Sequence, residues 1–573
     1  MGYSEVLCHI CGVSFNISRF RTGTEPRAAA WTNTGDGKYS FVQLPDIYYY
    51  MNHAGCSRDS GCFCVERPSD GEPDSMEITD SAYEPLEATQ NDSTWELDSN
   101  YESESGSEDS QDESDSSSTA SEHLYHEFKS YFDDTSHGET GFSEQTKIFT
   151  DEGEAKISAI ERVAELEHIA GRHCKMTKGY NGHYISVEAM RGCNTFQCLV
   201  RKPNRWESEP NDEEFETRGD FFLSGLSDVM ASRDGSHSPV FPERHGCREP
   251  YAENYIWVPE TADEYAMPFH PTCLEVFKRA SLFRYGLVDL ECLTQWWALE
   301  TRSNNFDSFP RHDAVKAGRV QWWEHNRGDE FLAANPCFVP GLDSILSAAA
   351  SDEDHQGCGL EHMEGIQSGQ GDIFTGLPSE IQILVLSGLR SRDIANLRLA
   401  SRAFRRLPQS LFYNLTLREM PWLYEAWSSL PLSFWATTTE SELKKRHQDQ
   451  TDQMASLQST LRVLQKDARN ADEPGFNNTA IEAVKKQIFE CRSEFDTMRP
   501  TTSVPLLSRT ETNWYGLQTD LKRNRKALLG LRNRRRIWKD CQMILSRVDK
   551  YRQQGKMLPG EAIDVVEISR LAL

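Results

Sequence analysis

The chain has 573 residues, several times the roughly 100–200 residues of a typical domain, so the sequence predicts two to four folded units with linkers between them. Hydrophobic residues make up 38% of it, and no run reaches the about 18 apolar residues of a membrane-spanning helix, so we expect no membrane partner. The N-terminus MGYSEVLCHI lacks the basic start and apolar run of a signal peptide, so the 15 cysteines are expected to stay reduced inside the cell, in the cytoplasm, the nucleus or both.

Residues 1–66 open with a pair of cysteines at a metal-ligand spacing. Cys8 and Cys11 are separated by two residues, and Gly12 follows them. This is the spacing of a zinc knuckle, in which the glycine lets backbone N–H groups approach the sulfur atoms. The pair supplies only half of a tetrahedral site, so a second pair of ligands has to come from another part of the chain.

An acidic, serine-rich stretch comes next and carries much of the net charge of −28. Between residues 69 and 127 there are 19 acidic residues and no lysine or arginine. Such a stretch buries too little apolar surface to offset the entropy lost on ordering, so residues 67–150 are predicted to be a disordered insert. We favour a solubilising linker. The alternative is a segment for phosphorylation, because Ser105 and Ser110 each have an acidic residue three positions on.

The segment 151–350 is rich in aromatic residues and mixes helical with strand patterns, so we expect an α+β domain. The patterns predict a helix over residues 156–171 and short strands over 183–190 and 196–202. Residues 272–300 are predicted to be mostly helical.

The string QWW occurs twice in this domain, at 295–297 and at 321–323. Tryptophan has a large apolar surface, so paired tryptophans predict packing in the core. The alternative is an aromatic-lined pocket for a ligand or a peptide.

Two other groups of cysteine and histidine could complete the metal site: His270 with Cys273, or His53 with Cys56 near Cys62 and Cys64. A tetrahedral zinc site of Cys8, Cys11, His270 and Cys273 would join the segments on either side of the acidic insert into one folded body. The alternative is that these cysteines are reduced thiols of the hydrophobic core. A structural zinc ion is therefore the cofactor that the sequence suggests, and none is required.

After a linker at 351–372, residues 373–420 predict three short amphipathic helices. Pro378 suits the first turn of a helix whose apolar residues recur at helical spacing: Ile381, Leu384, Val385 and Leu389. Ser391 is suited to cap the second helix, and Ser401 to open a third. Helices of two or three turns are only marginally stable in isolation. Apolar surface of this kind is usually covered by a partner.

This segment resembles an F-box, the motif that begins with Leu-Pro, continues with Glu-Ile and closes with a Leu-Arg-Leu-x-Ser-Arg-x-Phe run. The matching residues are Leu377, Pro378, Glu380, Ile381, Leu397, Arg398, Leu399, Ser401, Arg402 and Phe404. More loosely, the order of a Cys-x-x-Cys-Gly, an aromatic-rich body and a central F-box followed by EMPWLYEAW resembles a group of filamentous-fungal F-box proteins.

The resemblance implies a substrate-recruiting subunit of an SCF (Skp–cullin–F-box) E3 ubiquitin ligase, bound to the Skp adaptor and, through it, to a cullin. The residues expected to contact the adaptor are Leu377, Pro378, Ile381, Leu384, Leu386, Leu389, Ile394, Leu397 and Leu399. The remaining domains would then bind a client protein. No WD, kelch or leucine-rich repeat is detectable, so the sequence does not identify the client-binding element.

Enzymatic signatures are missing from the sequence. It contains no GxGxxG, no phosphate-binding loop, no HExxH and no GxSxG, so we expect an adaptor without catalytic residues. A constellation assembled only in three dimensions would be expected among the following residues: His168, His173, Cys174 and Cys198.

Residues 421–573 predict a helical C-terminal region. Apolar residues spaced three and four apart form two stripes and predict two helices: Met454, Leu457, Leu461, Leu464 and Ala468, then Ile481, Val484, Ile488, Cys491, Phe495 and Met498. Each stripe is short, so we expect these helices to pack against each other and against the body of the protein. With the segments before it, this region predicts an α+β fold that is predominantly α.

A third C-terminal helix is predicted over residues 514–551, and it is strongly basic. Between Lys522 and Lys539 there are nine basic residues and no acidic one, including the run RNRRR. A solvated helix face accounts for this, and nucleic acid is not expected as a partner. The alternative function is nevertheless a zinc-stabilised nuclear protein that binds nucleic acid through this helix.

Overall fold

The structure is a computed structural model of the whole chain, and it describes the following residues: 6–31, 60–66, 147–150, 153–156, 166–177, 179–202, 206–208, 212–228, 266–302, 309–319, 323–351, 372–404, 407–470, 476–497 and 500–557. Three predictions therefore fall largely outside the described residues: the acidic insert apart from 147–150, the ligands His53 and Cys56, and the linker 351–372 apart from its two end residues.

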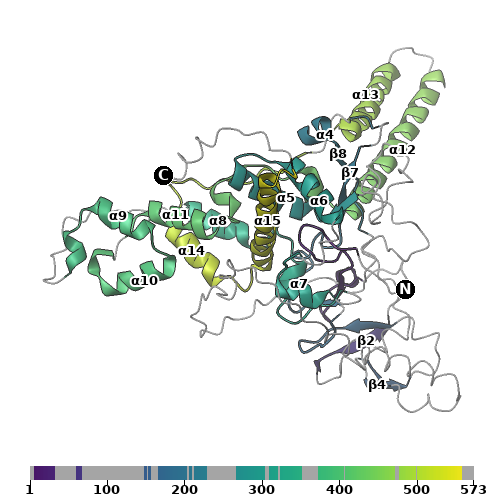
Figure 1. Ribbon diagram of the computed structural model, residues 1–573. Helices are drawn as coiled ribbons and strands as arrows, with labels where there is room; N and C mark the ends of the chain where they lie inside the picture. The colour runs from purple at the N-terminus through teal and green to yellow at the C-terminus, as the bar shows by residue number, and fades with distance from the viewer. Residues whose placement is uncertain are drawn as a thin grey trace.

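Helix predominates in this fold, as predicted. About 54% of the described residues are helical and 9% lie in strands. The helices surround a long C-terminal helix, α15 (Leu529–Gln553), which runs through the middle of the molecule (Figure 1). Within the described ranges, no helix combines the length and the apolar character that crossing a bilayer demands.

Three small sheets contain the strands. A four-stranded sheet has the order β4 (Gly153–Lys156), β3 (Lys147–Thr150), β2 (Phe63–Glu66) and β5 (Leu166–Ile169), and only β2 and β3 are parallel. A three-stranded antiparallel sheet has the order β8 (Phe221–Leu223), β7 (Gln197–Arg201) and β9 (Ala266–Phe269). The third is a parallel pair, β1 (Ser18–Phe20) with β6 (Gly179–Asn181).

Two local predictions in the aromatic-rich domain were wrong, and a third is confirmed. The strand predicted over 196–202 exists as β7. The helix predicted over 156–171 is wrong for residues 166–169, which pair with β2 as strand β5, so long-range pairing overrides the local helical pattern there; residues 157–165 lie outside the described residues. Residues 183–190 form turns, and the Asn181 side chain stabilises the first of them by accepting the His183 N–H at 2.9 Å.

The helical body is built from α5 (Pro271–Tyr285), α6 (Leu290–Arg302), α8 (Leu342–Ser351), α14 (Trp514–Arg523) and α15. The helix predicted over 272–300 is therefore present as α5 and α6. The helix predicted over 514–551 is broken, because residues 524–528 separate α14 from α15. Three tryptophans of the QWW strings lie in the core as predicted, since Trp296, Trp297 and Trp323 are buried, while Trp322 lies outside the described residues.

Short helices complete the body: α4 (Glu214–Arg218), α7 (Asp313–Gly318) and the 3-10 turns η1 (Arg27–Ala29), η5 (Glu330–Ala333), η10 (Tyr424–Ala426) and η11 (Phe434–Thr437). One continuous cluster of buried residues runs from Val6 to Met557. The N-terminal segment and the C-terminal helices therefore share a single core.

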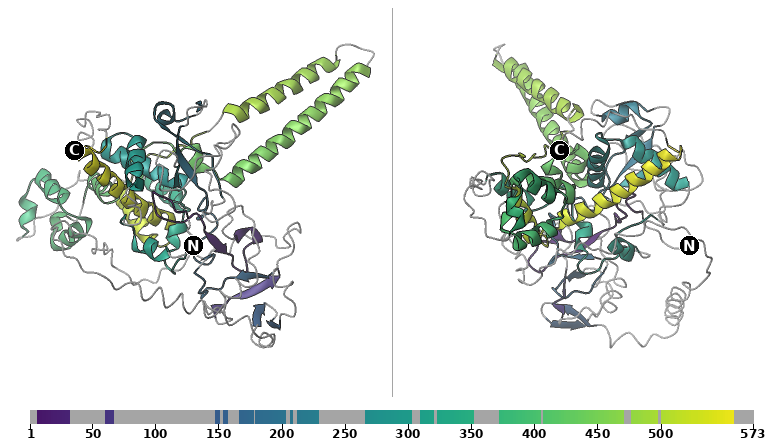
Figure 2. Two further views of the ribbon diagram at one scale, coloured as in Figure 1. Left: turned by 45° about the vertical axis from the view of Figure 1, so that its right-hand side comes forward. Right: turned by 60° about the vertical axis from the view of Figure 1, so that its left-hand side comes forward.

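The helices α12 (Glu440–Asn470) and α13 (Phe476–Thr497) form a hairpin that projects from the body (Figures 1 and 2). Both helices were predicted, and Ile481 and Cys491 of the second stripe are buried between them. The expected packing against the body is wrong for most of the hairpin, which projects away from it. The base of the hairpin is held by Arg191, which pairs with Glu442 at 2.9 Å.

A buried ion pair ties α15 to the segment after the F-box-like motif. Arg534 and Glu425 are paired at 2.8 Å with both side chains almost fully buried. Glu425→Gln leaves the guanidinium charge without compensation, so we expect it to lower the free energy of unfolding by about 3–5 kcal/mol in denaturant titrations. Arg523→Gln breaks the exposed pair with Asp520 and should change stability little. Equal effects of the two substitutions would contradict this account of the core.

Candidate functional site

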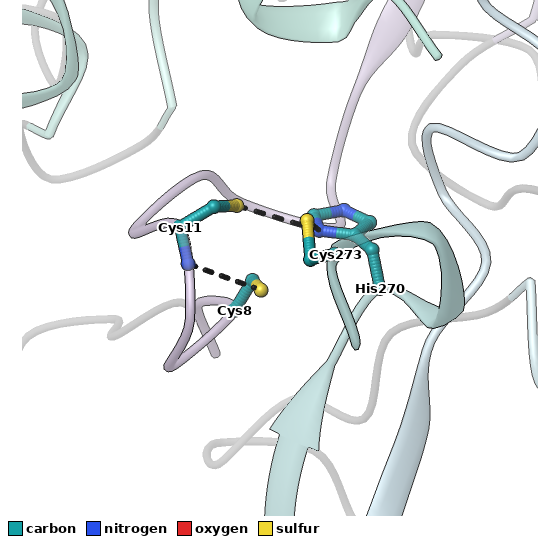
Figure 3. Close-up of side chains that lie close together, drawn as sticks. All are labelled: Cys8, Cys11, His270 and Cys273. Atoms are coloured by element: carbon teal, nitrogen blue, oxygen red, sulfur yellow. Dashed lines mark hydrogen bonds between the residues drawn. The ribbon is translucent and has the colours of Figure 1, made fainter. Parts of the chain in front are cut away.

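The four predicted metal ligands Cys8, Cys11, His270 and Cys273 meet in the structure (Figure 3). Their ligand atoms all lie within 4.8 Å of one another, and all four residues are buried. Two come from a turn near the N-terminus and two from the start of α5, so the group joins segments 259 positions apart.

The N-terminal turn has the geometry that a zinc knuckle requires. The Cys11 N–H donates to Cys8 Sγ at 3.4 Å, and the Gly12 N–H donates to the Cys8 carbonyl at 2.7 Å. Gly12 has a φ of 74°, a left-handed conformation that is strained for other residues. A Cβ there would also lie 3.0 Å from Val315 Cγ1. The glycine after the second cysteine is thus needed both for the turn and for its close packing.

The orientation of His270 is set by its second ring nitrogen. Nε2 lies 3.0 Å from the Cys193 carbonyl, to which it donates, so Nδ1 faces the sulfur atoms. Nδ1 is 3.6 Å from Cys11 Sγ and 3.8 Å from Cys273 Sγ. A metal-ligating histidine characteristically donates its other N–H to a carbonyl or carboxylate, which fixes the ring as it is fixed here.

The side chains of this group shift one another's pKa values so that a proton on His270 is favoured. Burial opposes charge on the His270 imidazole, but the neighbouring Cys8 and Cys11 sulfurs outweigh it and raise the pKa of His270 to about 10. Burial would raise the pKa of the Cys11 thiol, but hydrogen bonds with Cys273, Cys8 and His270 hold this pKa well below its ordinary value. A bound metal ion would replace that proton, so binding should release protons.

Two arginines hold the outside of the turn. Arg311 donates to the Ile10 and His9 carbonyls at 2.5 and 2.8 Å, and Arg536 of α15 donates to the Cys11 carbonyl at 2.8 Å. Both arginines also lie near Asp540, whose pKa burial raises to about 6 in spite of them. Three thiolates and a divalent cation carry a net negative charge, which these guanidinium groups offset.

The group could therefore hold a metal ion. Three sulfurs and one imidazole nitrogen in a closed, buried set suit tetrahedral zinc, and a set with all four positions filled by protein is typical of a structural site. Its ligands would bind the N-terminal turn to α5, and Arg536 would connect both to α15.

The F-box-like segment contains η8 (Ile373–Gly376), α9 (Ser379–Ser387), α10 (Ser391–Ala400), η9 (Arg402–Phe404) and α11 (Gln409–Glu419). The first two predicted helices are present. The third, predicted to open at Ser401 and to end at Pro408, is wrong: the Ser401 hydroxyl donates to the Asp372 carboxylate at 2.8 Å, and the described residues there form only the 3-10 turn η9. The helix α11, which follows Pro408, was not predicted. Ser391 does not cap α10, because the cap position is Arg390 and the Ser391 hydroxyl donates to the Glu419 carboxylate.

The helices α9 and α10 carry an unusual amount of exposed apolar surface. Of the twelve large hydrophobic side chains that are exposed among the described residues, five lie on these helices and a sixth, Ile373, lies in the preceding turn η8; the five are Ile381, Ile383, Leu384, Val385 and Leu399. We call these six residues the α9–α10 apolar surface. Leu399 is 89% exposed and Leu384 is 66% exposed. Both helices lie at the end of the molecule, away from α15 (Figure 1).

The nine residues expected to contact an adaptor fall into three classes of exposure. Four are exposed: Pro378, Ile381, Leu384 and Leu399. Three are half-buried: Leu377, Leu389 and Leu397. Leu386 and Ile394 are buried at 2% and 3% exposure, so the structure gives these two a packing role inside the segment rather than an open contact surface.

Three members of the α9–α10 apolar surface were not among the predicted contacts: Ile373, Ile383 and Val385. A signal for two of them was present in the sequence, because the run ILVL at 383–386 makes α9 apolar on more than one side. A helix of that kind is normally covered on more than one side.

The helix α11 holds α9 and α10 against the body. Arg418 donates to the Ser387 carbonyl at 2.5 Å and also to the Leu389 carbonyl. On its other side α11 packs on α14, where the buried Gln518 amide donates to the Phe412 carbonyl at 3.0 Å. The apolar surface is therefore presented by a segment with a fixed attachment.

The residues named for a catalytic constellation are brought together only in part. His168 Nε2 lies 3.4 Å from Cys174 Sγ. Cys198 is buried in β7, and its N–H donates to the Ser224 hydroxyl. His173 is exposed, and neither it nor Cys198 belongs to the group that His168 and Cys174 form.

We predict that the purified protein binds zinc through the Cys8, Cys11, His270 and Cys273 group. Cys8→Ser should lower the zinc content by about one equivalent, because a hydroxyl is a much poorer zinc ligand than a thiolate. Metal analysis by mass spectrometry measures this, and Cys198→Ser, which removes a buried thiol outside the group, should leave the content unchanged. A zinc content indifferent to Cys8→Ser would rule out the site.

Comparison with protein-family models, with curated proteins and with solved structures gave no match. The resemblance to the F-box family therefore rests on the motif residues themselves.

Proposed function

We propose that this chain is a substrate-recruiting F-box subunit of an SCF-type E3 ubiquitin ligase. Residues 373–420 bind the Skp adaptor and, through it, a cullin, while another subunit's enzyme transfers ubiquitin. The observation that carries the proposal is the α9–α10 apolar surface, which coincides with the F-box-like motif and has no cover from the described part of the chain.

The size of this surface suits a partner held by several contacts at once. Burying one leucine or isoleucine contributes roughly 1.5–3 kcal/mol, against an association cost of about 4–15 kcal/mol. No single side chain can meet that cost, but several acting together can. Loss of two well-exposed members should therefore weaken binding severely.

The remaining parts of the chain are left to bind the client. The α12–α13 hairpin projects on the side of the molecule away from α9 and α10 (Figure 1). A client bound along the hairpin or the body would thus not compete with the adaptor for the same surface. The proposed zinc ion has a structural role in this arrangement, and no residue is assigned a catalytic one.

The alternative of nucleic-acid binding through the basic helix receives less support. Within the run RNRRR, Arg534 and Arg536 are buried, and they are paired with Glu425 and Asp540. Farther along α15, Arg547 pairs with Glu300 at 2.7 Å. Arginines that are used in this way cannot neutralise phosphate groups, which is the main source of affinity for nucleic acid.

A paired substitution on the apolar surface tests the adaptor function. Leu384→Asp with Leu399→Asp should reduce recovery of purified Skp–cullin complex by at least about tenfold, because a carboxylate would have to be desolvated in the interface. Both side chains are exposed, so circular dichroism and the melting temperature should be unchanged.

The matched control is Val463→Asp with Phe489→Asp, which changes two similarly exposed apolar residues of the hairpin. It should leave recovery of Skp intact. Equal recovery by the wild type and by the Leu384 and Leu399 double variant would refute the proposal. Salt-sensitive binding to nucleic acid without any recovery of Skp would favour the alternative.

A further inference from the structure

A second group of cysteine and histidine side chains lies in the four-stranded sheet and the turn that follows it. Cys62, His168 and Cys174 place one sulfur or nitrogen atom each within 4.8 Å of one another. Cys62 and His168 are buried, and Cys174 is half-buried. They come from two segments, just before β2 and from β5 onward, that are distant in sequence and antiparallel neighbours in the sheet.

The backbone around Cys62 repeats features of the first metal group. The Gly171 N–H donates to Cys62 Sγ at 3.4 Å, as the Cys11 N–H does to Cys8 Sγ. Gly61, directly before Cys62, has a φ of 74°. A Cβ on Gly171 would lie 2.2 Å from the Gly61 carbonyl carbon, so these two turns can meet only because Gly171 has no side chain.

His168 directs one ring nitrogen toward a sulfur of this group. The ring is 2% exposed, and its Nε2 lies 3.4 Å from Cys174 Sγ. Its Nδ1 is buried and has no hydrogen-bond partner. A metal ion shared with Cys174 would therefore bind Nε2, and Nδ1 would remain without a hydrogen-bond partner.

A catalytic Cys–His pair explains the same residues less well. The Nδ1 atom of His168 has no partner that would orient the ring for either role, so this nitrogen does not distinguish the two. A catalytic pair, however, would leave Cys62 without a role. A metal ion uses all three side chains.

We propose that Cys62, His168 and Cys174 form a second zinc site. Two thiolates and one imidazole are ligands that zinc prefers, and three of them leave one position of a tetrahedron for water or another ligand. The ion would clip residues 60–66 to residues 166–177, so that the sequence between them forms a closed loop. This inference does not depend on the proposed ligase function.

The zinc content of purified full-length protein tests the inference. The wild type should contain about two zinc ions per chain by mass spectrometry, since each group binds one. Cys174→Ser and His168→Gln should each remove one of them, and Cys8→Ser should remove the other. Cys292→Ser, at a buried thiol in neither group, should retain both.

The number of zinc ions per chain also tests the proposal when a variant does not fold. A folded Cys174→Ser variant that loses one ion but keeps the ion sensitive to Cys8→Ser supports the second site. If a variant unfolds and loses both ions, the wild type decides, with two ions per chain supporting the site and one overturning it. Two ions retained by folded Cys174→Ser and His168→Gln would also overturn it.

Discussion

The arginines of α15 form the interaction on which most of the fold depends. Arg536 holds the carbonyl of Cys11 in the N-terminal turn, and Arg534 donates to the Pro336 carbonyl and pairs with Glu425 after the F-box-like segment. Buried guanidinium groups cannot be left unpaired, so each one fixes the position of the segment that compensates it. A C-terminal helix thus aligns the first residues of the chain with its middle.

This arrangement explains why the apolar surface is stable while exposed. The residues that hold α9 and α10 in place point inward, with Leu386 and Ile394 buried, and α11 connects them to α14. The outward side of the same short helices keeps leucine and isoleucine in contact with solvent. A partner would therefore meet a surface that is already formed and would not have to order the helices on binding, which lowers the cost of association.

The two cysteine and histidine groups each join segments that are far apart in the sequence. The first lies where the N-terminal turn meets α5, and the second where the segment at β2 meets β5. Both connect segments separated by a long stretch of sequence, so each would counter the chain entropy that opposes closing such a loop. Both use a glycine at positive φ to bring backbone N–H groups close to sulfur.

The sequence by itself determined the features that depend on residues close together in the chain. The spacing of apolar residues predicted α12 and α13, the Leu-Pro-x-Glu-Ile pattern predicted the start of α9, and Cys8-x-x-Cys11-Gly12 predicted half of a group that could hold a metal ion. For the other half the sequence left two pairs with the same spacing open, His270 with Cys273 and His53 with Cys56, and the structure brings His270 and Cys273 to the first pair.

Tertiary structure alone decided the rest, because the relevant contacts join residues far apart in the chain. Pairing with β2 made a strand of 166–169 where the local pattern favoured helix, and it brought His168 and Cys174 to Cys62. Packing decided that Leu386 and Ile394 point inward while Leu384 and Leu399 point outward, although all four are apolar. It also turned basic residues of α15 into core residues, since only the fold supplied the carboxylates that allow an arginine to be buried.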